Sequence, residues 1–177
     1  MPTTTTRPRT TSSTDAIVLL KNDHREIKKL FADFQKAGDG AEKTKQRLVD
    51  KMIELLTVHT YIENEVMYPR VRELLPDLED DILESYEEHH VADVLVMELA
   101  NMKASDERFT AKATVLIENV THHIDEEEEE WFPQVRDGLG RKALGEIGRE
   151  MLAARKKAPR RPSQPSALKK TIDAVIA

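Results

Sequence analysis

Two segments of the chain repeat one pattern: a histidine, glutamates four and six residues later, and then an aromatic residue followed by proline. They are residues 59–69 and 123–133. Residues four apart lie on the same face of a helix, so His59 and Glu63 present an imidazole and a carboxylate together, as do His123 and Glu127. Both groups bind metal ions in proteins. The repeat therefore predicts two ligand pairs for a cation.

The remaining histidines also lie in predicted helices. His24 occupies an apolar stripe at helical spacing, and His89 and His90 lie in the middle of a third amphipathic segment. Each part has a plainer interpretation: a lone histidine can be a hydrogen-bonded core residue, and the acidic run 125–130 can be a solvated face. Together they predict a metal site, because imidazoles and carboxylates that face a core are costly to bury unless they are paired or bind a cation.

The composition favours a single helical domain. The chain has 177 residues, 34% of them charged, 39% hydrophobic and 5% aromatic, with Glu, Leu, Lys, Ala and Val dominant. We therefore predict an all-α fold. Because the chain contains no cysteine, disulfides, thiolate zinc sites and iron–sulfur clusters are excluded, and any bound metal has nitrogen and oxygen ligands.

Charge and hydropathy limit the partners. The formal net charge of −6 argues against general nucleic-acid binding. No apolar run approaches the roughly 18 residues that span a bilayer, and the N-terminus has no apolar signal region. We expect a cytoplasmic protein without a membrane partner.

The apolar periodicity predicts four long helices within residues 14–137, after a disordered Thr- and Pro-rich leader over residues 1–13. The helices run from Thr14 or Asp15 to Gly38, from about Ala41 toward Pro69, from about Leu78 to Lys103, and from Asp106 toward Pro133. Pro69 is expected to kink the second helix or open its last turns. The arrangement predicted is an up-down bundle.

Two further segments follow. Residues 138–157 predict a short accessory helix packed on the outside of the bundle, and residues 158–177 a flexible, basic, Pro-rich tail. The last ten residues can form a short amphipathic helix that docks back or meets a protein partner. Contact of the tail with nucleic acid is a weaker alternative, since no aromatic residue interleaves its cations.

Taken together, these features resemble hemerythrin-like proteins with an HHE cation-binding domain. The resemblance covers residues 15–136. Its carriers are Asp23-His24-Arg25-Glu26-Ile27-Lys28-Lys29-Leu30-Phe31, His59 to Pro69, Glu88-His89 with Leu95, Val96 and Leu99, and His123 to Pro133.

The resemblance implies two non-haem iron ions. The implied nitrogen ligands are His24, His59, His89 and His123, and the implied bridging carboxylates are Glu63 and Glu127. His89 is chosen over His90 by register, because the positions 3, 6, 7 and 10 residues after His24 and after His89 are all apolar. The position three after His90 is Asp93. Glu65, Glu88, Glu128 and Glu129 are candidates to orient the imidazoles, or are simply solvated.

One departure from the oxygen-carrying members of that family bears on function. Their third helix supplies two histidines four residues apart, whereas Ser85 precedes His89 by four here and Tyr86 stands beside it. This makes Tyr86 a candidate extra ligand or hydrogen-bond donor. It leaves room at each iron for an incoming oxygen species. Zinc or copper would compete for the same ligands.

We therefore hypothesise that the chain reacts with hydrogen peroxide and protects against oxidative or nitrosative stress, as a catalase-like enzyme. The alternative is a module that senses O2, NO or iron without turnover and signals through its tail. A bundle without any metal is the third interpretation.

Overall fold

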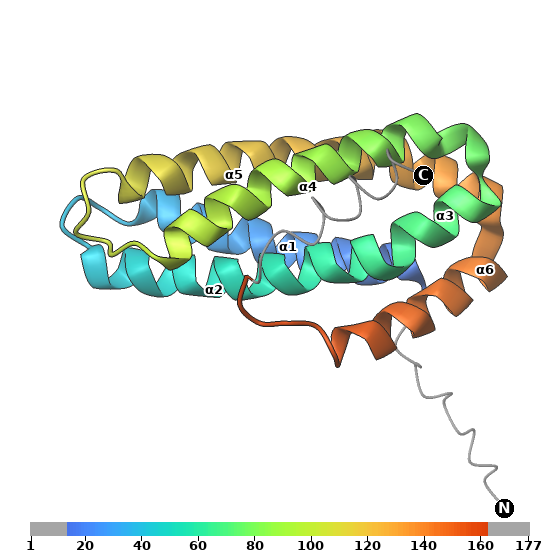
Figure 1. Cartoon of the computed structure of the whole chain (residues 1–177), viewed down its shortest axis with the longest axis horizontal. Coiled ribbons are helices and arrows are strands. Elements are labelled where there is room, and N and C mark those ends of the chain that lie inside the picture. The colour runs from blue at the N-terminus through green and yellow to red at the C-terminus, as the bar shows by residue number, and fades with distance from the viewer. Residues whose placement is uncertain (1–13, 163–177) are drawn as a thin grey trace, which may run out of the picture.

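The computed structural model describes residues 14–162, and Figure 1 shows the arrangement of the helices. Within this range there are no strands, and four long helical segments pack antiparallel to one another. This confirms the predicted all-α, four-helix up-down bundle. The predicted leader and the terminal part of the tail, with its short helix, lie outside the described residues. None of the helices in residues 14–162 combines the length and apolar character that crossing a bilayer requires.

The elements follow the predicted order. They are α1 (Ala16–Lys36), α2 (Glu42–Ile62), η1 (Glu63–Met67), α3 (Tyr68–Leu74), η2 (Pro76–Leu78), α4 (Glu79–Ala100), α5 (Phe109–Glu126), η3 (Glu127–Trp131) and α6 (Phe132–Arg155). Asp15 caps α1 by accepting a 3.1 Å hydrogen bond from the Val18 N–H. Gly40, with φ 81°, allows the turn between α1 and α2.

The repeated sequence pattern becomes a repeated backbone feature. η1 and η3 are π-helical turns, and each begins at the glutamate of a His–Glu pair. In the first, the Tyr68 N–H donates to the Glu63 carbonyl, five residues back; in the second, the Phe132 N–H donates to the Glu127 carbonyl. A proline follows each aromatic residue and cannot donate, so the helix widens just before it. The expectation that Pro69 would open the last turns of its helix is confirmed.

The structure corrects the sequence analysis at residues 138–157. The separate short helix predicted there is not seen in the described chain, because α6 begins at Phe132 and continues to Arg155. It bends at Gly140, whose φ of 70° and ψ of 178° are not helical. Its second half is not an outside appendage either: Leu144, Ile147 and Met151 are fully buried. They pack against the start of α1 and against η1.

The apolar interior is divided into two clusters. The loop-end core lies toward the α1–α2 and α4–α5 connections and includes Ile27, Phe31, Met52, Leu56, Val96, Leu99, Leu116 and Ile117. The proline-end core lies at the opposite end and includes Ile17, Leu20, Ile62, Met67, Val71, Ile82, Phe132 and Leu144. Each long helical segment contributes to both clusters. The buried polar residues of the next section lie between them.

Gly148 and Gly145 provide a test of the α6 packing. A Cβ atom at Gly148 would lie 1.6 Å from the Thr14 carbonyl oxygen, whereas a Cβ at Gly145 would meet nothing closer than 3.8 Å. Gly148→Ala should therefore lower the free energy of unfolding by about 2–3 kcal/mol, because α6 must move off α1. Gly145→Ala should leave it unchanged or raise it by up to about 1 kcal/mol, since alanine favours a helix. Urea unfolding followed by circular dichroism measures both, and equal effects would contradict the packing.

Candidate metal centre

Six buried side chains meet in the middle of the bundle. They are the six predicted ligands: His24 from α1, His59 from α2, Glu63 from η1, His89 from α4, His123 from α5 and Glu127 from η3. None is more than 5% exposed. Residues more than one hundred positions apart in the chain thus share one polar layer between the two apolar cores.

The four imidazoles form two pairs. The Nε2 atoms of His24 and His59 are 3.2 Å apart, and those of His89 and His123 are 3.0 Å apart. Two nitrogens that each lie about 2.1 Å from one ion, at angles between a right angle and a tetrahedral one, are roughly 3.0–3.4 Å apart. Each pair therefore has the spacing of two ligands on a common ion.

The two carboxylates lie between these pairs. Glu63 Oε2 is 3.3 Å from the Nε2 atom of His59 and 3.4 Å from that of His89. Glu127 Oε2 is 3.3 Å from His24 Nε2 and 3.7 Å from His123 Nε2. Each carboxylate thus reaches one imidazole of each pair, which is the position of a ligand that bridges two ions.

The outer nitrogen of every imidazole has an oxygen partner. The Nδ1 contacts are His24 to Glu128 at 2.9 Å, His59 to Asp23 at 3.3 Å, His89 to Asn64 at 2.9 Å and His123 to Glu88 at 2.6 Å. In the neutral form of each ring, an Nδ1 atom that donates to its oxygen partner leaves the lone pair on Nε2, which points into the layer. Facing lone pairs repel one another, and a cation between them removes the repulsion.

The carboxylates lack the hydrogen bonds that buried oxygens normally have. Both oxygens of Glu63 and Oε2 of Glu127 have no hydrogen-bond partner among the described residues. Burial and repulsion from Glu127 raise the pKa of Glu63 well above its ordinary value. Burial alone would raise the pKa of Glu127 too, but His123 and His24 lower it to about 2. Burial therefore opposes the charged form of Glu63, and a bound cation would favour it.

Comparison with known proteins assigns the family. Residues 15–135 match the sequence profile described as the hemerythrin HHE cation-binding domain. The chain belongs to this family. Its buried histidines and glutamates, with orphaned oxygens and inward lone pairs, have the donor set that a cation requires.

Three relatives were found. A DNA nickase of Nostoc sp. is 27% identical over 143 residues, which are 81% of this chain and 40% of that protein. An uncharacterized hemerythrin-like protein of Schizosaccharomyces pombe is 27% identical over 112 residues, 63% of this chain and 54% of that protein. The chain thus spans about half the length of these relatives or less. The crystal structure of an HHE domain-containing protein from Mycobacterium kansasii has the same fold, with a TM-score of 0.66, 22% identity and coverage of 81% and 86%.

A tyrosine joins the HHE centre, but it is not the predicted one. The Tyr68 hydroxyl donates to Glu127 Oε1 at 3.1 Å and lies 3.2 Å from His89 Nε2. Tyr86 packs its ring against that of Tyr68, with centroids 5.3 Å apart. Burial and the nearby Glu127 carboxylate raise the pKa of Tyr68 well above its ordinary value, so its hydroxyl keeps its proton.

Of the four outer glutamates considered as orienting residues, Glu88 and Glu128 bond to ligand imidazoles. Asp23 and Asn64 have the same role, and sequence reasoning missed both. Each is adjacent to a ligand, as Asp23-His24 and Glu63-Asn64, but each orients a histidine on another helix. That pairing has no signature in the local sequence.

Arg155, near the end of α6, is a further residue that the sequence did not indicate. Its guanidinium donates to Asp23 Oδ1 at 3.0 Å and to Asp23 Oδ2 at 2.5 Å, and Asp23 in turn accepts from His59. Burial alone would raise the pKa of Asp23, but His59 and Arg155 together lower it. The second half of α6 therefore fixes the position of one metal-facing imidazole through a carboxylate.

Arg155→Ala should weaken cation binding without unfolding the bundle. Asp23 would lose its bidentate partner and hold His59 less firmly, and changing such a supporting residue typically costs about 10- to 100-fold in metal affinity. Arg149→Ala removes the same charge from an exposed position of the same helix and serves as the control. Competition with a chromophoric chelator measures both affinities. Equal affinities of the two variants would show that Arg155 has no part in the centre.

Proposed function

We propose that the HHE domain binds two iron ions and that this centre reacts with small oxygen species, above all hydrogen peroxide. The observation that carries the proposal is the placement of Glu63 and Glu127 between two imidazole pairs, since bridging carboxylates define two adjacent ion positions. A single ion would need only one of the pairs.

Iron is the metal that we favour. The donors are imidazole nitrogens and carboxylate oxygens from facing helices of a bundle, the setting in which carboxylate-bridged iron pairs are built. Zinc or copper would compete on affinity alone. Bound iron would supply the redox change that peroxide chemistry needs, with coordination positions left open by this ligand set.

The residues around the centre support such a reaction. The Tyr68 hydroxyl is fully buried and holds a proton within 3.2 Å of His89 Nε2 and 3.1 Å of Glu127 Oε1, where it can donate to an incoming oxygen atom. Phe132 stacks on His24 with ring planes 7° apart and keeps this imidazole in place. Disproportionation converts two hydrogen peroxide molecules into two waters and one O2, so no external reductant is required.

A second candidate function is sensing of O2, NO or iron without turnover. The observation that favours it is the contact from Arg155 through Asp23 to His59. This contact joins the metal-facing imidazole to the segment that leads into the C-terminal tail. A change of metal state that moves His59 would also move Asp23 and Arg155. The position of the tail would then change, and a protein partner could bind one position in preference to the other.

We do not extend the nickase name of the Nostoc relative to this chain. The matching part is 40% of that protein, and the formal net charge of −6 opposes binding to phosphate backbones. Incubation with supercoiled plasmid is a direct check, since a single nick releases the supercoils.

Adjacent histidines supply the test of the iron proposal. His89→Ala should lose at least one iron per chain and should reduce peroxide disproportionation by more than the roughly 100-fold that changing a residue behind a ligand can cause. His90→Ala should keep two irons and full turnover, because His90 lies outside both ligand groups. Iron analysis after anaerobic loading and an oxygen electrode give the two readouts. If the wild-type protein binds two irons but evolves no O2, the proposed peroxide reaction is contradicted, whereas the proposed iron centre is supported.

Limited proteolysis tests the sensing function. Trypsin cleaves after the basic residues beyond Arg155, so the rate of cleavage reports how firmly this segment is held. Sensing predicts a rate that differs between iron-loaded and metal-free wild type, and no difference in Arg155→Ala, in which the contact to Asp23 is broken. Equal rates for loaded and metal-free wild type would contradict it.

A further inference from the structure

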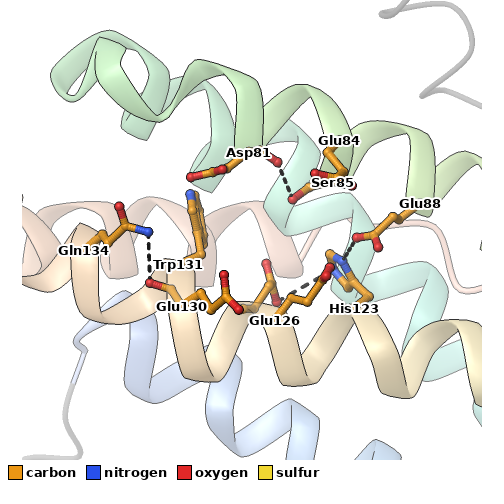
Figure 2. A pocket seen from close by; sticks show the side chains of 10 residues that line it. Asp81, Glu84, Ser85, Glu88, His123, Glu126, Glu130, Trp131 and Gln134 are labelled. Atoms are coloured by element: carbon orange, nitrogen blue, oxygen red, sulfur yellow. Dashed lines mark hydrogen bonds and ion pairs between the residues drawn. The ribbon is translucent and has the colours of Figure 1, made fainter.

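An acidic pocket opens beside the centre, between α4 and the α5–η3 segment (Figure 2). It has about 90 Å³ of free volume, which is room for several water molecules. Six of its lining residues are carboxylic acids: Asp81, Glu84, Glu88, Glu126, Glu127 and Glu130. No lysine or arginine is among the described residues that line it. Such a concentration of one sign of charge attracts cations.

The pocket is in contact with the candidate metal centre. His123 and Glu127 both line it. Glu127 is 2% exposed, and its Oε2 atom has no hydrogen-bond partner. Trp131, 4% exposed, also lines the pocket and has an Nε1–H without a partner. The pocket is thus lined by two buried side chains that each have an unpartnered polar atom, which an acidic patch on the surface alone would not provide.

The other cavity beside the ligands is much smaller. It has about 10 Å³ of free volume, and its lining includes His59, His89 and His123. This is at most enough for one water molecule, and a hydrated cation is larger. Of these two cavities, the acidic pocket is the one with room for a hydrated ion.

A third group of potential ligands stands at the mouth of the pocket. It consists of Glu88, His122 and Glu126, whose donor atoms lie within 4.8 Å of one another. His122 and Glu126 repeat the four-residue spacing of the buried pairs, with Nε2 and Oε1 3.2 Å apart. Their side chains are 66% and 44% exposed, whereas that of Glu88 is 16% exposed. Glu88 also accepts from His123 Nδ1 at 2.6 Å, so it contacts both this group and the buried centre.

We propose that Glu88, His122 and Glu126 form an entrance site that takes a divalent cation from solvent and passes it through the acidic pocket to the buried centre. This inference rests on the proposed binding of metal there. Three ligands, two of them exposed, bind an ion weakly and release it readily, as a transfer site requires. The carboxylates that line the pocket can bind the ion as it moves toward Glu127. The ion therefore keeps oxygen ligands until it reaches the imidazoles.

The test compares loading rates of full-length, metal-free protein with Co²⁺. Trp131 is the only tryptophan of the chain and lines the pocket beside His123 and Glu127, so quenching of its fluorescence follows arrival of the ion. The variant is His122→Ala combined with Glu126→Gln. The control is Glu118→Gln, which removes the same charge from an exposed position of α5 outside the pocket. We expect loading of the double variant to be about tenfold slower than that of the control, within the range of electrostatic steering.

Equilibrium dialysis separates this inference from the proposed function. Wild type should bind two Co²⁺ tightly and one weakly, and the double variant should keep the two tight ions and lose the weak one. Loading as fast as in the control, or a weak ion that the double variant retains, would overturn the entrance site. Absence of tight ions from wild type would overturn the metal centre instead, and the weak ion would still decide whether the mouth of the pocket binds a cation.

Discussion

The structure depends on a layer of six ionisable side chains that have no adequate partners in one another. Four imidazole Nε2 atoms point inward, and three carboxylate oxygens accept no hydrogen bond. Burying a charge without compensation costs several kcal/mol, and apolar cores lie on both sides of this layer. If this layer served only to stabilise the bundle, apolar side chains such as leucine would be expected at these positions. Bound cations compensate the charge and the lone pairs together, and the outer hydrogen bonds hold the imidazoles ready for them.

The backbone is adapted to this layer by its two π-helical turns. The His–Glu spacing of four residues aligns an imidazole with a carboxylate on one helix, and the wider turn after each glutamate changes the direction in which the next residues point. Tyr68 and Phe132, the aromatic residues that close these turns, consequently face the centre: one donates to Glu127 and the other stacks on His24. The proline after each prevents the ordinary helical bond from reforming. One sequence repeat thus supplies four of the six candidate ligands, the widened turn and the aromatic residue packed against the centre.

What the sequence could predict is what local spacing determines. The bundle follows from apolar periodicity, and the two His–Glu pairs follow from spacing within single helices. The full set of six candidate ligands came from the resemblance to HHE proteins, with His89 preferred to His90 by register. The hydrogen-bond partners of the imidazoles come from other helices, so Asp23 and Asn64 could not be assigned from the sequence. Tyr68 and Tyr86 show that the sequence cannot predict contacts between helices. Both tyrosines lie beside the polar layer, and the rotation of each helix about its axis determines which hydroxyl contacts the candidate ligands. For α6, an amphipathic pattern in the sequence cannot show whether the helix lies outside the bundle or in its core. The close approach of Gly148 to the start of α1 shows that the second half of α6 is part of the core.

The two halves of the centre differ in how they meet the outside. The half formed by His24 and His59 is closed: Phe132 covers one imidazole, and Arg155 holds Asp23 against the other. In the other half, His123 lines the acidic pocket, and the Tyr68 hydroxyl lies 3.2 Å from His89 Nε2. In the proposed function, ions and small oxygen species would arrive through the acidic pocket, with the Tyr68 hydroxyl as a nearby proton donor. Arg155 holds Asp23, which bonds to His59, so the proposed sensing would act through the half formed by His24 and His59.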